Sequence, residues 1–263
     1  MPISFTSAEI AVWVGSFLWP LARIAAMVSI TPVFGGQMVP MQIRLMTAVG
    51  LTWVVFPTLA TPPAIDLLSL AGVLVVAQQM LIGLLMGFML QLVFGAFVLG
   101  GNYIATSMGL GFASMVDPGN GVQVPVVSQY YTVMVTMMFL ALNGHLLFIE
   151  VLMESFHSLP IGSGGLLSSD YLQVVHWSSQ MFVGSMLIAL PALTSVLLIN
   201  LAFGVVTRAA PQLNIFAVGF PVTMLAGFFV MMELSPAIKP QLELLLESAF
   251  QVLWNLGEVH GGP

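Results

Sequence analysis

The sequence predicts an all-α, polytopic membrane protein, and three observations lead to this prediction. Hydrophobic residues make up 59% of the 263 positions, and the mean hydropathy is +1.07. Only 5% of the residues are charged, against about 25% in a soluble domain. The charges are separated by uncharged intervals of roughly 20 to 50 residues, and a helix needs about 20 apolar residues to cross a bilayer. The intervals are apolar throughout rather than alternating, which argues against a transmembrane barrel.

We expect one integral membrane domain over residues 1–263, built from about six long apolar helices. Their expected ranges are 10–30, 43–60, 68–101, 126–156, 174–207 and 213–233. The ranges 68–101 and 174–207 each cover about 34 residues, or roughly 50 Å of helix. These two are therefore interpreted as kinked helices, helical hairpins or helices that project beyond the bilayer.

A separate amphipathic helix is expected at the C-terminal end, over 237–258. Polar side chains recur at every fourth position from Glu243 to Asn255, and leucine, alanine and phenylalanine fill the positions between them. The polar face is acidic, which disfavours anionic lipid. We expect the helix to pack on a partner protein or another subunit.

Composition also excludes several functions. Four basic residues cannot form a phosphate-neutralising patch, so no nucleic-acid partner is expected. The chain has no cysteine, which excludes disulfides, thiolate metal sites and cysteine nucleophiles. The motifs H-E-x-x-H, G-x-S-x-G and Walker A are absent. We therefore expect a protein that is not an enzyme and that uses no cofactor or metal.

The 102–125 segment is the most informative connection. It contains four glycines and two prolines, so it cannot be a regular helix throughout, yet its first half is apolar. Non-helical backbone at membrane depth is tolerated only where it is buried in protein or lines a cavity. The residues leave two interpretations open: an apolar loop that plugs a pore, or a surface connection resting in lipid headgroups.

Two groups of polar residues lie within or beside the apolar helices. Arg208 precedes Pro211, Gln212 and Asn214 at a helix junction, where it either serves a function or reaches the headgroups. Asn143 and His145 lie within the expected 126–156 helix. His145 either hydrogen-bonds between helices or takes part in a proton relay with Glu150. The spacing Gly83-x-x-x-Gly87 permits close helix contact.

Several of these motifs occur in one order along the chain. They are Gly109-Leu-Gly-Phe-Ala-Ser-Met-Val-Asp-Pro118, Asn143-Gly-His145, Ser155-Phe-x-x-Leu-Pro160, Arg208-x-x-Pro-Gln-Leu-Asn214 and Gly219-Phe-Pro221. The series resembles the flagellar biosynthetic protein FliR family, the R/T subunit of type III secretion export gates, over residues 10–256. Pro-Gln-Leu-Asn is its sharpest motif.

The resemblance implies an assembly in the bacterial inner membrane, at the flagellar basal body. FliR would join copies of FliP and FliQ in a hetero-oligomeric FliPQR complex, on which FlhB docks. This complex would be the portal for unfolded flagellar export substrates, surrounded by membrane lipid. The resemblance also implies a fusion of a FliP-like and a FliQ-like part, with helical hairpins raised out of the bilayer plane.

The resemblance assigns the 102–125 segment to the pore as a plug. The plug and gate candidates are Met108, Gly109, Leu110, Gly111, Phe112, Met115, Asp117 and Pro118. The candidates for intramembrane polar and packing roles are Asn143, His145, Arg208, Pro211, Gln212 and Asn214. The alternative function is a secondary transporter of small solutes, with His145, Glu150 and Arg208 as coupling residues. A purely structural membrane scaffold is a third interpretation.

Overall fold

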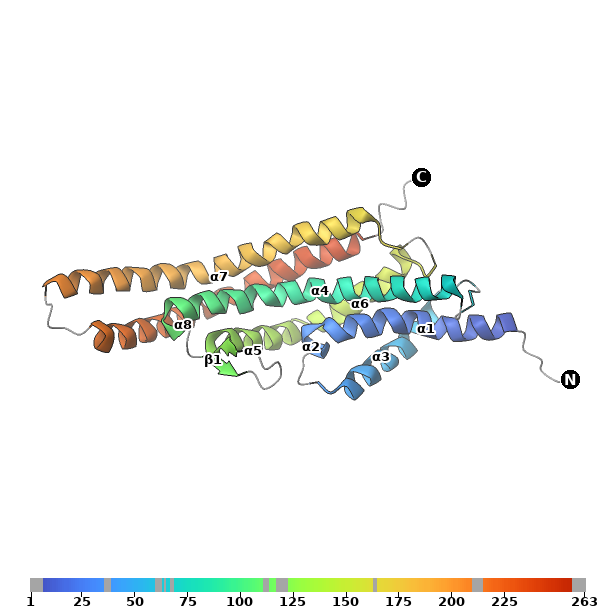
Figure 1. Cartoon of the computed structure of the whole chain (residues 1–263), viewed down its shortest axis with the longest axis horizontal. Coiled ribbons are helices and arrows are strands. Elements are labelled where there is room, and N and C mark those ends of the chain that lie inside the picture. Colours follow the sequence, from blue (N-terminus) through green and yellow to red (C-terminus); the bar gives the residue numbers. More distant parts are fainter. Residues whose placement is uncertain are drawn as a thin grey trace. The chain divides into compact units, whose positions relative to one another are not determined.

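The computed structural model describes residues 7–35, 39–59, 63, 65–66, 69–110, 114–116, 123–162, 165–209 and 215–256. Most of these residues are helical, which confirms the all-α class (Figure 1). The elements in chain order are α1 (Ser7–Ile30), α2 (Pro32–Gly35), α3 (Met41–Val55), the 3₁₀ turn η1 (Phe56–Thr58), α4 (Leu70–Ser107), β1 (Ser114–Val116), β2 (Gln123–Pro125), α5 (Val126–Ala141), α6 (Gly144–Ser158), α7 (Ser168–Ala209) and α8 (Ile215–Trp254).

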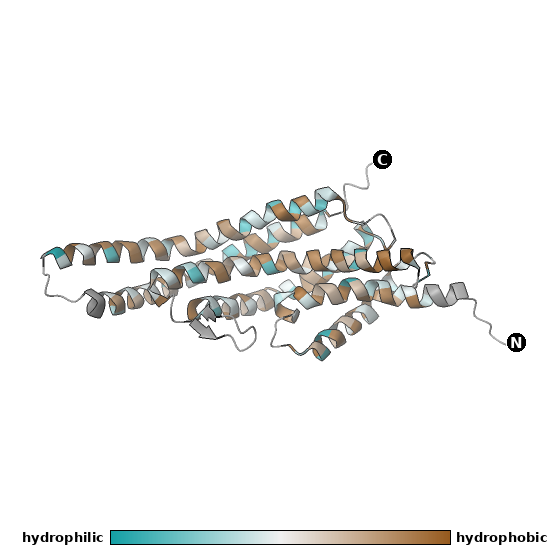
Figure 2. Cartoon of the chain, viewed as in Figure 1, coloured by the Kyte–Doolittle hydropathy of each residue, from teal (hydrophilic) through white to brown (hydrophobic). Residues whose placement is uncertain are grey.

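Four of the described helices are long and apolar enough to cross a membrane, as expected for a polytopic protein. The candidate spans are Trp13–Ile30 in α1, Leu70–Ser107 in α4, Ser168–Arg208 in α7 and Gly219–Trp254 in α8. Figure 2 shows the hydrophobic colouring that runs along much of α4. The count rises to five if α5 and α6 form one broken span.

The expectation of six crossings is too high in two places. The helix expected at 43–60 is α3, which has 15 residues and is therefore about 22 Å long. This is shorter than a hydrocarbon core of about 30 Å. The helix expected at 126–156 is divided into α5 and α6, which are bent by 69° relative to each other.

The bend between α5 and α6 has a local cause. Asn143 adopts the left-handed conformation, with φ of 56°, and α6 begins at the next residue, Gly144. Asparagine tolerates this conformation better than most residues, and an Asn-Gly pair is a common turn signal. The α-helical hydrogen-bond pattern therefore stops at Leu142 and restarts after Asn143.

Two helices continue past their expected ends. α4 runs to Ser107, so the first six residues of the 102–125 segment are helical rather than irregular. α8 runs without interruption from Ile215 to Trp254, with three prolines inside it. The expected end at 233 and the separate helix expected to start at 237 are therefore wrong, because both positions lie inside α8. Membrane helices accommodate prolines because neighbouring groups satisfy the freed carbonyl oxygens.

The described chain forms two compact units. Unit 1 contains Met1–Gln91, Asn143–Trp177 and Ser248–Pro263, and unit 2 contains Leu92–Leu142 and Ser178–Glu247. Helices α4, α7 and α8 each contribute residues to both units. In the C-terminal part of α8 most apolar positions are buried, although Leu244 is exposed; the buried ones are Leu242, Leu245, Leu246, Ala249, Phe250 and Leu253.

Glycines permit close contact between α1 and α4 in unit 1. A Cβ atom added to Gly83 would overlap the main-chain carbonyl oxygen of Arg23, and one added to Gly87 would lie 2.8 Å from the carbonyl oxygen of Met27. Only glycine fits at such a backbone-to-backbone approach. The structure confirms the close contact that the Gly83-x-x-x-Gly87 spacing predicts.

Candidate functional site

The 102–125 segment leaves α4 in unit 2 at a well-defined point. Met108 is fully buried, and its amide nitrogen donates a 3.0 Å hydrogen bond to the carbonyl oxygen of Ile104. Gly109 follows with φ of +78°, a left-handed turn that commonly ends a helix. Leu110 is half-buried in the next turn. We call Met108 and Gly109 the leading stem of the segment.

The leading stem packs against α8. A Cβ added to Gly227 would lie 2.5 to 2.7 Å from Cγ, Sδ and Cε of Met108, so the thioether lies directly across this glycine. A Cβ added to Gly109 would lie 2.9 Å from the Phe220 ring. The space beside these two glycines is thus filled by neighbouring side chains, and α8 contacts the chain at the point where it leaves α4.

Further along the segment, residues 114–116 and 123–125 pair as antiparallel strands. The register places Ser114 opposite Pro125, Met115 opposite Val124 and Val116 opposite Gln123. Met115 therefore lies on a paired strand. Four other plug candidates lie outside the described residues: Gly111, Phe112, Asp117 and Pro118.

The segment rejoins the helices at the start of α5, its trailing stem, formed by Val126, Val127 and Ser128. The Ser128 hydroxyl donates a 2.9 Å hydrogen bond to the carbonyl oxygen of Val98 in α4. A Cβ added to Gly101 would lie 2.9 Å from the Cα atom of Ser128. The trailing stem is therefore fixed by close backbone packing and by one hydrogen bond.

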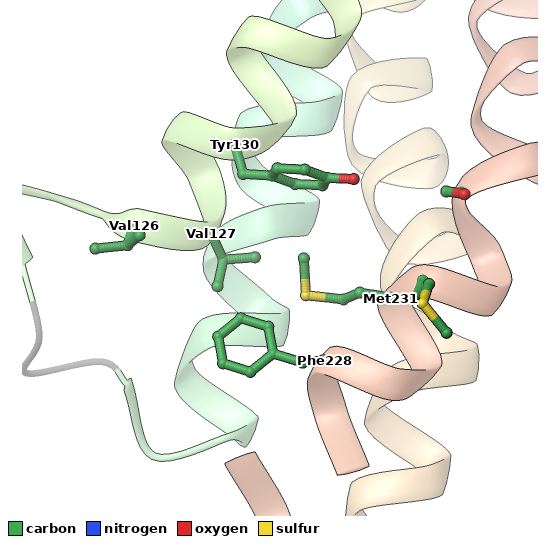
Figure 3. Close-up of a pocket in the computed structure, with 7 residues that line it drawn as sticks. Val126, Val127, Tyr130, Phe228 and Met231 are labelled. Atoms are coloured by element: carbon green, nitrogen blue, oxygen red, sulfur yellow. The ribbon is translucent and has the colours of Figure 1, made fainter. Parts of the chain in front are cut away.

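A cavity of about 350 Å³ lies between the start of α5 and α8 in unit 2. Figure 3 shows Val127 and Tyr130 from α5 opposite Phe228 and Met231 from α8. Val126, Met232 and Ser235 complete the lining. The wall is apolar apart from the hydroxyls of Tyr130 and Ser235, and the thioethers make it adaptable in shape.

The polar candidates are distributed between the two units. Asn143 and His145 belong to unit 1, where Asn143 forms the bend and His145 is half-buried. The Nδ1 atom of His145 is buried and has no hydrogen-bond partner among the described residues, while Glu150 is exposed. The described residues therefore show no hydrogen bond from His145 Nδ1 that would support a proton relay with Glu150.

Arg208 belongs to unit 2 and is exposed in the last turn of α7. A cation there interacts favourably with the negative end of the helix dipole. Its exposure favours the interpretation in which it reaches polar surroundings. The remaining candidates of this junction, Pro211, Gln212 and Asn214, lie outside the described residues.

Sequence reasoning missed a buried polar residue that makes four hydrogen bonds to described residues. Arg23, in the middle of α1, is fully buried in unit 1. Its guanidinium donates to Gln79 Oε1 at 2.9 Å, to Ser155 Oγ at 3.0 Å and to the carbonyl oxygen of Leu159 at 2.7 Å, and it also bonds the carbonyl oxygen of Ser155.

The Arg23 cluster joins three helices, α1, α4 and α6. The acceptors are all neutral oxygens, and two of them are carbonyls at the C-terminal end of α6, where the helix dipole is negative. The Arg23 Cζ atom also lies 4.1 Å from the centre of the Phe156 ring. The signal in the sequence was an ionisable residue inside an apolar run, which usually indicates a partner.

The sequence was compared with known protein families and proteins, and it matches one family over most of its length. Residues 14–249 match the family described as bacterial export proteins, family 1. The "Flagellar biosynthetic protein FliR" of Escherichia coli (strain K12) is 36% identical over 256 residues, which are 97% of each chain. The protein of the same name from Pectobacterium carotovorum subsp. carotovorum is 37% identical over 256 residues, again 97% of each chain.

A less similar relative carries the same name. The "Flagellar biosynthetic protein FliR" of Aquifex aeolicus (strain VF5) is 31% identical over 231 residues, 88% of this chain and 89% of the relative. The likeness therefore extends over nearly the full length and includes both units. This chain belongs to the FliR family of bacterial export proteins and is a membrane-embedded component of the flagellar export apparatus.

Proposed function

We propose that this chain assembles with FliP and FliQ in the bacterial inner membrane into the pore that admits unfolded flagellar export substrates. FlhB docks on the assembly, and the 102–125 segment of this chain plugs the closed channel. The full-length match to FliR proteins is the observation that supports this proposal most directly. The chain's role is structural and gating rather than enzymatic.

The apolar surface supports an assembly of several chains. Large hydrophobic side chains are exposed along α7 and α8, among them Leu197, Leu201 and Leu225, each about two thirds or more exposed. Contiguous apolar surface of this kind is covered either by lipid or by other protein subunits. Both kinds of neighbour fit a subunit of a membrane complex.

The geometry of the 102–125 segment supports the plug. Its two ends are held in unit 2, Met108 and Gly109 against α8 and Ser128 against α4, so the segment begins and ends at defined points. An apolar segment can seal a channel against ions because ions do not shed their hydration in an apolar constriction. Methionine side chains can then adapt to a passing chain.

Deletion of residues 109–118 tests the proposed function. We expect the complex with FliP and FliQ to assemble normally and the membrane to become leaky to small ions, measured as conductance in planar bilayers. A matched variant replaces the same residues with a glycine-serine segment of equal length, which should also leak because the apolar seal is lost. A complex that assembles and conducts like the wild type would contradict the plug role.

Co-purification separates the gate from the alternative functions. The gate requires small membrane partners in a stable complex, whereas a secondary transporter would be isolated alone or as a homo-oligomer. The mass of the detergent-extracted complex decides between them. A purely structural scaffold would assemble with partners but show no conductance change on deletion of 109–118.

A further inference from the structure

Polar side chains are few in the second half of α7, over residues 194–207 in unit 2, and all but one of them are hydrogen-bonded within the helix. The hydroxyls of Thr194, Ser195 and Thr207 donate to carbonyl oxygens of α7 itself, at 2.8, 2.8 and 3.0 Å. The exception is Asn200, whose exposed side-chain amide makes no hydrogen bond to another described residue. Asn200 therefore offers a donor and an acceptor that the described part of this chain does not use.

Asn200 lies at a depth where water does not supply the missing partner. Arg208 marks the polar end of α7, and a separation of eight residues puts Asn200 about 12 Å further along the helix. This distance places the amide near the middle of a hydrocarbon core of about 30 Å. A polar group at that depth is costly unless it is hydrogen-bonded, and in membrane helices the partner commonly lies on a neighbouring helix.

Asn200 shares one face of α7 with Gly204, because side chains four residues apart lie one above the other on a helix. A Cβ atom added to Gly204 would meet no atom within 4 Å, so the glycine serves no close contact within the described chain. Leu197 and Leu201 flank the two residues, and they are 68% and 66% exposed. We call Leu197, Asn200, Leu201 and Gly204 the Asn200 face.

The composition of the Asn200 face fits a helix better than lipid. Acyl chains offer no hydrogen bond to an amide, and glycine in a helix interior lowers stability without a gain in packing. A second helix answers both features, because glycine lets two backbones approach closely and an amide can hydrogen-bond across the contact. Leu198, about 160° from Asn200 around the helix, is 66% exposed and purely apolar, as a lipid-facing residue would be.

We propose that the Asn200 face is the surface on which a membrane helix of another subunit packs. That helix is apolar, has a small residue opposite Gly204 and carries a hydrogen-bonding side chain opposite the Asn200 amide. This inference rests on the proposed assembly with FliP and FliQ, and it adds which surface of this chain forms a close helix contact there.

Asn200→Leu tests the hydrogen bond. The variant keeps the approximate size of the side chain and removes the amide. We expect the chain to reach membranes in the normal amount but to bind its partner roughly three- to tenfold more weakly, the range for one hydrogen bond between membrane helices. The measurement is the fraction of membrane-inserted chain that co-purifies with FliP and FliQ as the detergent concentration is raised.

The matched control is Leu198→Ala, which truncates an exposed side chain on the other side of the same helix. It should co-purify with FliP and FliQ like the wild type. Equal losses from Asn200→Leu and Leu198→Ala would overturn the proposal, because the effect would then not depend on the Asn200 face.

Gly204→Leu tests the close approach of the second helix. The new side chain enters space that is open within this chain but filled by the proposed partner. We expect co-purification to weaken by roughly tenfold or more. Val205→Leu enlarges the next residue, which points about 100° away, and should assemble like the wild type. Normal assembly of Gly204→Leu would overturn the proposal.

A photoreactive benzophenone amino acid in place of Leu201 identifies what covers the Asn200 face in the assembled complex. We expect a covalent adduct with another subunit, seen as a band with the summed mass of the two chains. Adducts with lipid alone, in a complex that contains FliP and FliQ, would overturn the proposal because the bilayer would then cover this face.

These results separate the inference from the proposed function. If the wild-type chain co-purifies with FliP and FliQ and both Asn200→Leu and Gly204→Leu do so equally well, the assembly stands and the assigned surface is wrong. If the wild-type chain is isolated without FliP and FliQ, the proposed assembly itself is wrong.

Discussion

The internal contacts of unit 1 differ in kind from those of unit 2. In unit 1 a buried arginine ties α1, α4 and α6 together through four directional hydrogen bonds, and Gly83 and Gly87 bring the α1 and α4 backbones into contact. In unit 2 the contacts at the two ends of the 102–125 segment use small residues, a methionine, a phenylalanine ring and one serine hydroxyl. The hydrogen bonds of Arg23 restrict both the distances and the orientations of the groups they join. The packing contacts in unit 2 restrict mainly distances.

The difference is one between directional hydrogen bonds in unit 1 and mainly non-directional apolar contacts in unit 2. Hydrogen bonds buried away from water are costly to break, because the partners find no replacement. Contacts between apolar atoms can slide, because each position offers similar dispersion energy. We therefore expect variants at the Arg23 cluster and the Gly83 contact of unit 1 to reduce stability more than a variant at the Ser128 contact of unit 2.

The largest effect is expected from Gly83→Ala in unit 1. The new Cβ would overlap the main-chain oxygen of Arg23 and lie 3.0 Å from the nitrogen of Met27, and neither backbone atom can move alone. We expect the free energy of unfolding to fall by about 3 kcal/mol or more. This should be seen as a lower amount of the chain in membranes and a lower melting temperature in detergent. Gly50→Ala, which meets no atom within 4 Å, is the matched control and should melt like the wild type. Equal melting of the two variants would contradict the close α1–α4 contact.

An intermediate effect is expected from Arg23→Lys. The variant keeps the buried charge but loses the planar fork that reaches Gln79, Ser155 and Leu159 together. We expect the free energy of unfolding to fall by about 1–3 kcal/mol, measured by thermal unfolding of the detergent-extracted complex. Ion conductance of the assembled complex should stay at the wild-type level. A leak without loss of stability would show that the Arg23 cluster belongs to the gate.

The smallest effect is expected from Ser128→Ala in unit 2. It removes one hydrogen bond to the Val98 carbonyl oxygen, worth about 1 kcal/mol, and leaves the backbone contact with Gly101 intact. Ser195→Ala removes a hydroxyl bonded within its own helix, to Pro191, and serves as the control. A greater loss of stability in Ser128→Ala than in Arg23→Lys would reverse the comparison between the two units.

The sequence predicted the helical class and much of the local packing, because both depend on nearby residues. Uncharged apolar intervals predicted the long helices α4 and α7 with ends wrong by a few residues, whereas α8 was expected as two helices, 213–233 and 237–258. The spacing of Gly83 and Gly87 predicted a close helix contact, and the structure shows that the partner is α1. These features follow from periodicity and residue size, which can be read directly along the chain.

Features that depend on distant residues were not predictable in the same way. Arg23 was visible as a charge in an apolar run, but its partners at Ser155 and Leu159 are 132 and 136 residues away. The contact of Met108 with Gly227 likewise joins two separate helices. The break at Asn143 had a local signal in the Asn-Gly pair, but the apolar residues on both sides favoured a single helix. The change to an amphipathic pattern after 237 indicated a separate helix, but α8 continues through it.

The hydrogen bonds of Arg23 also impose an order in time on the synthesis of the chain. Gln79 is made 56 residues after Arg23, and Ser155 is made 132 residues after it. At about 5–20 residues per second, the ribosome needs roughly 7 to 26 s to supply the second group of partners. During that interval α1 carries a cation without its final acceptors, which costs about 3 kcal/mol at the centre of a membrane helix. Although α1 is made before α4 and α6, it therefore reaches its finished state only after both of them have been made.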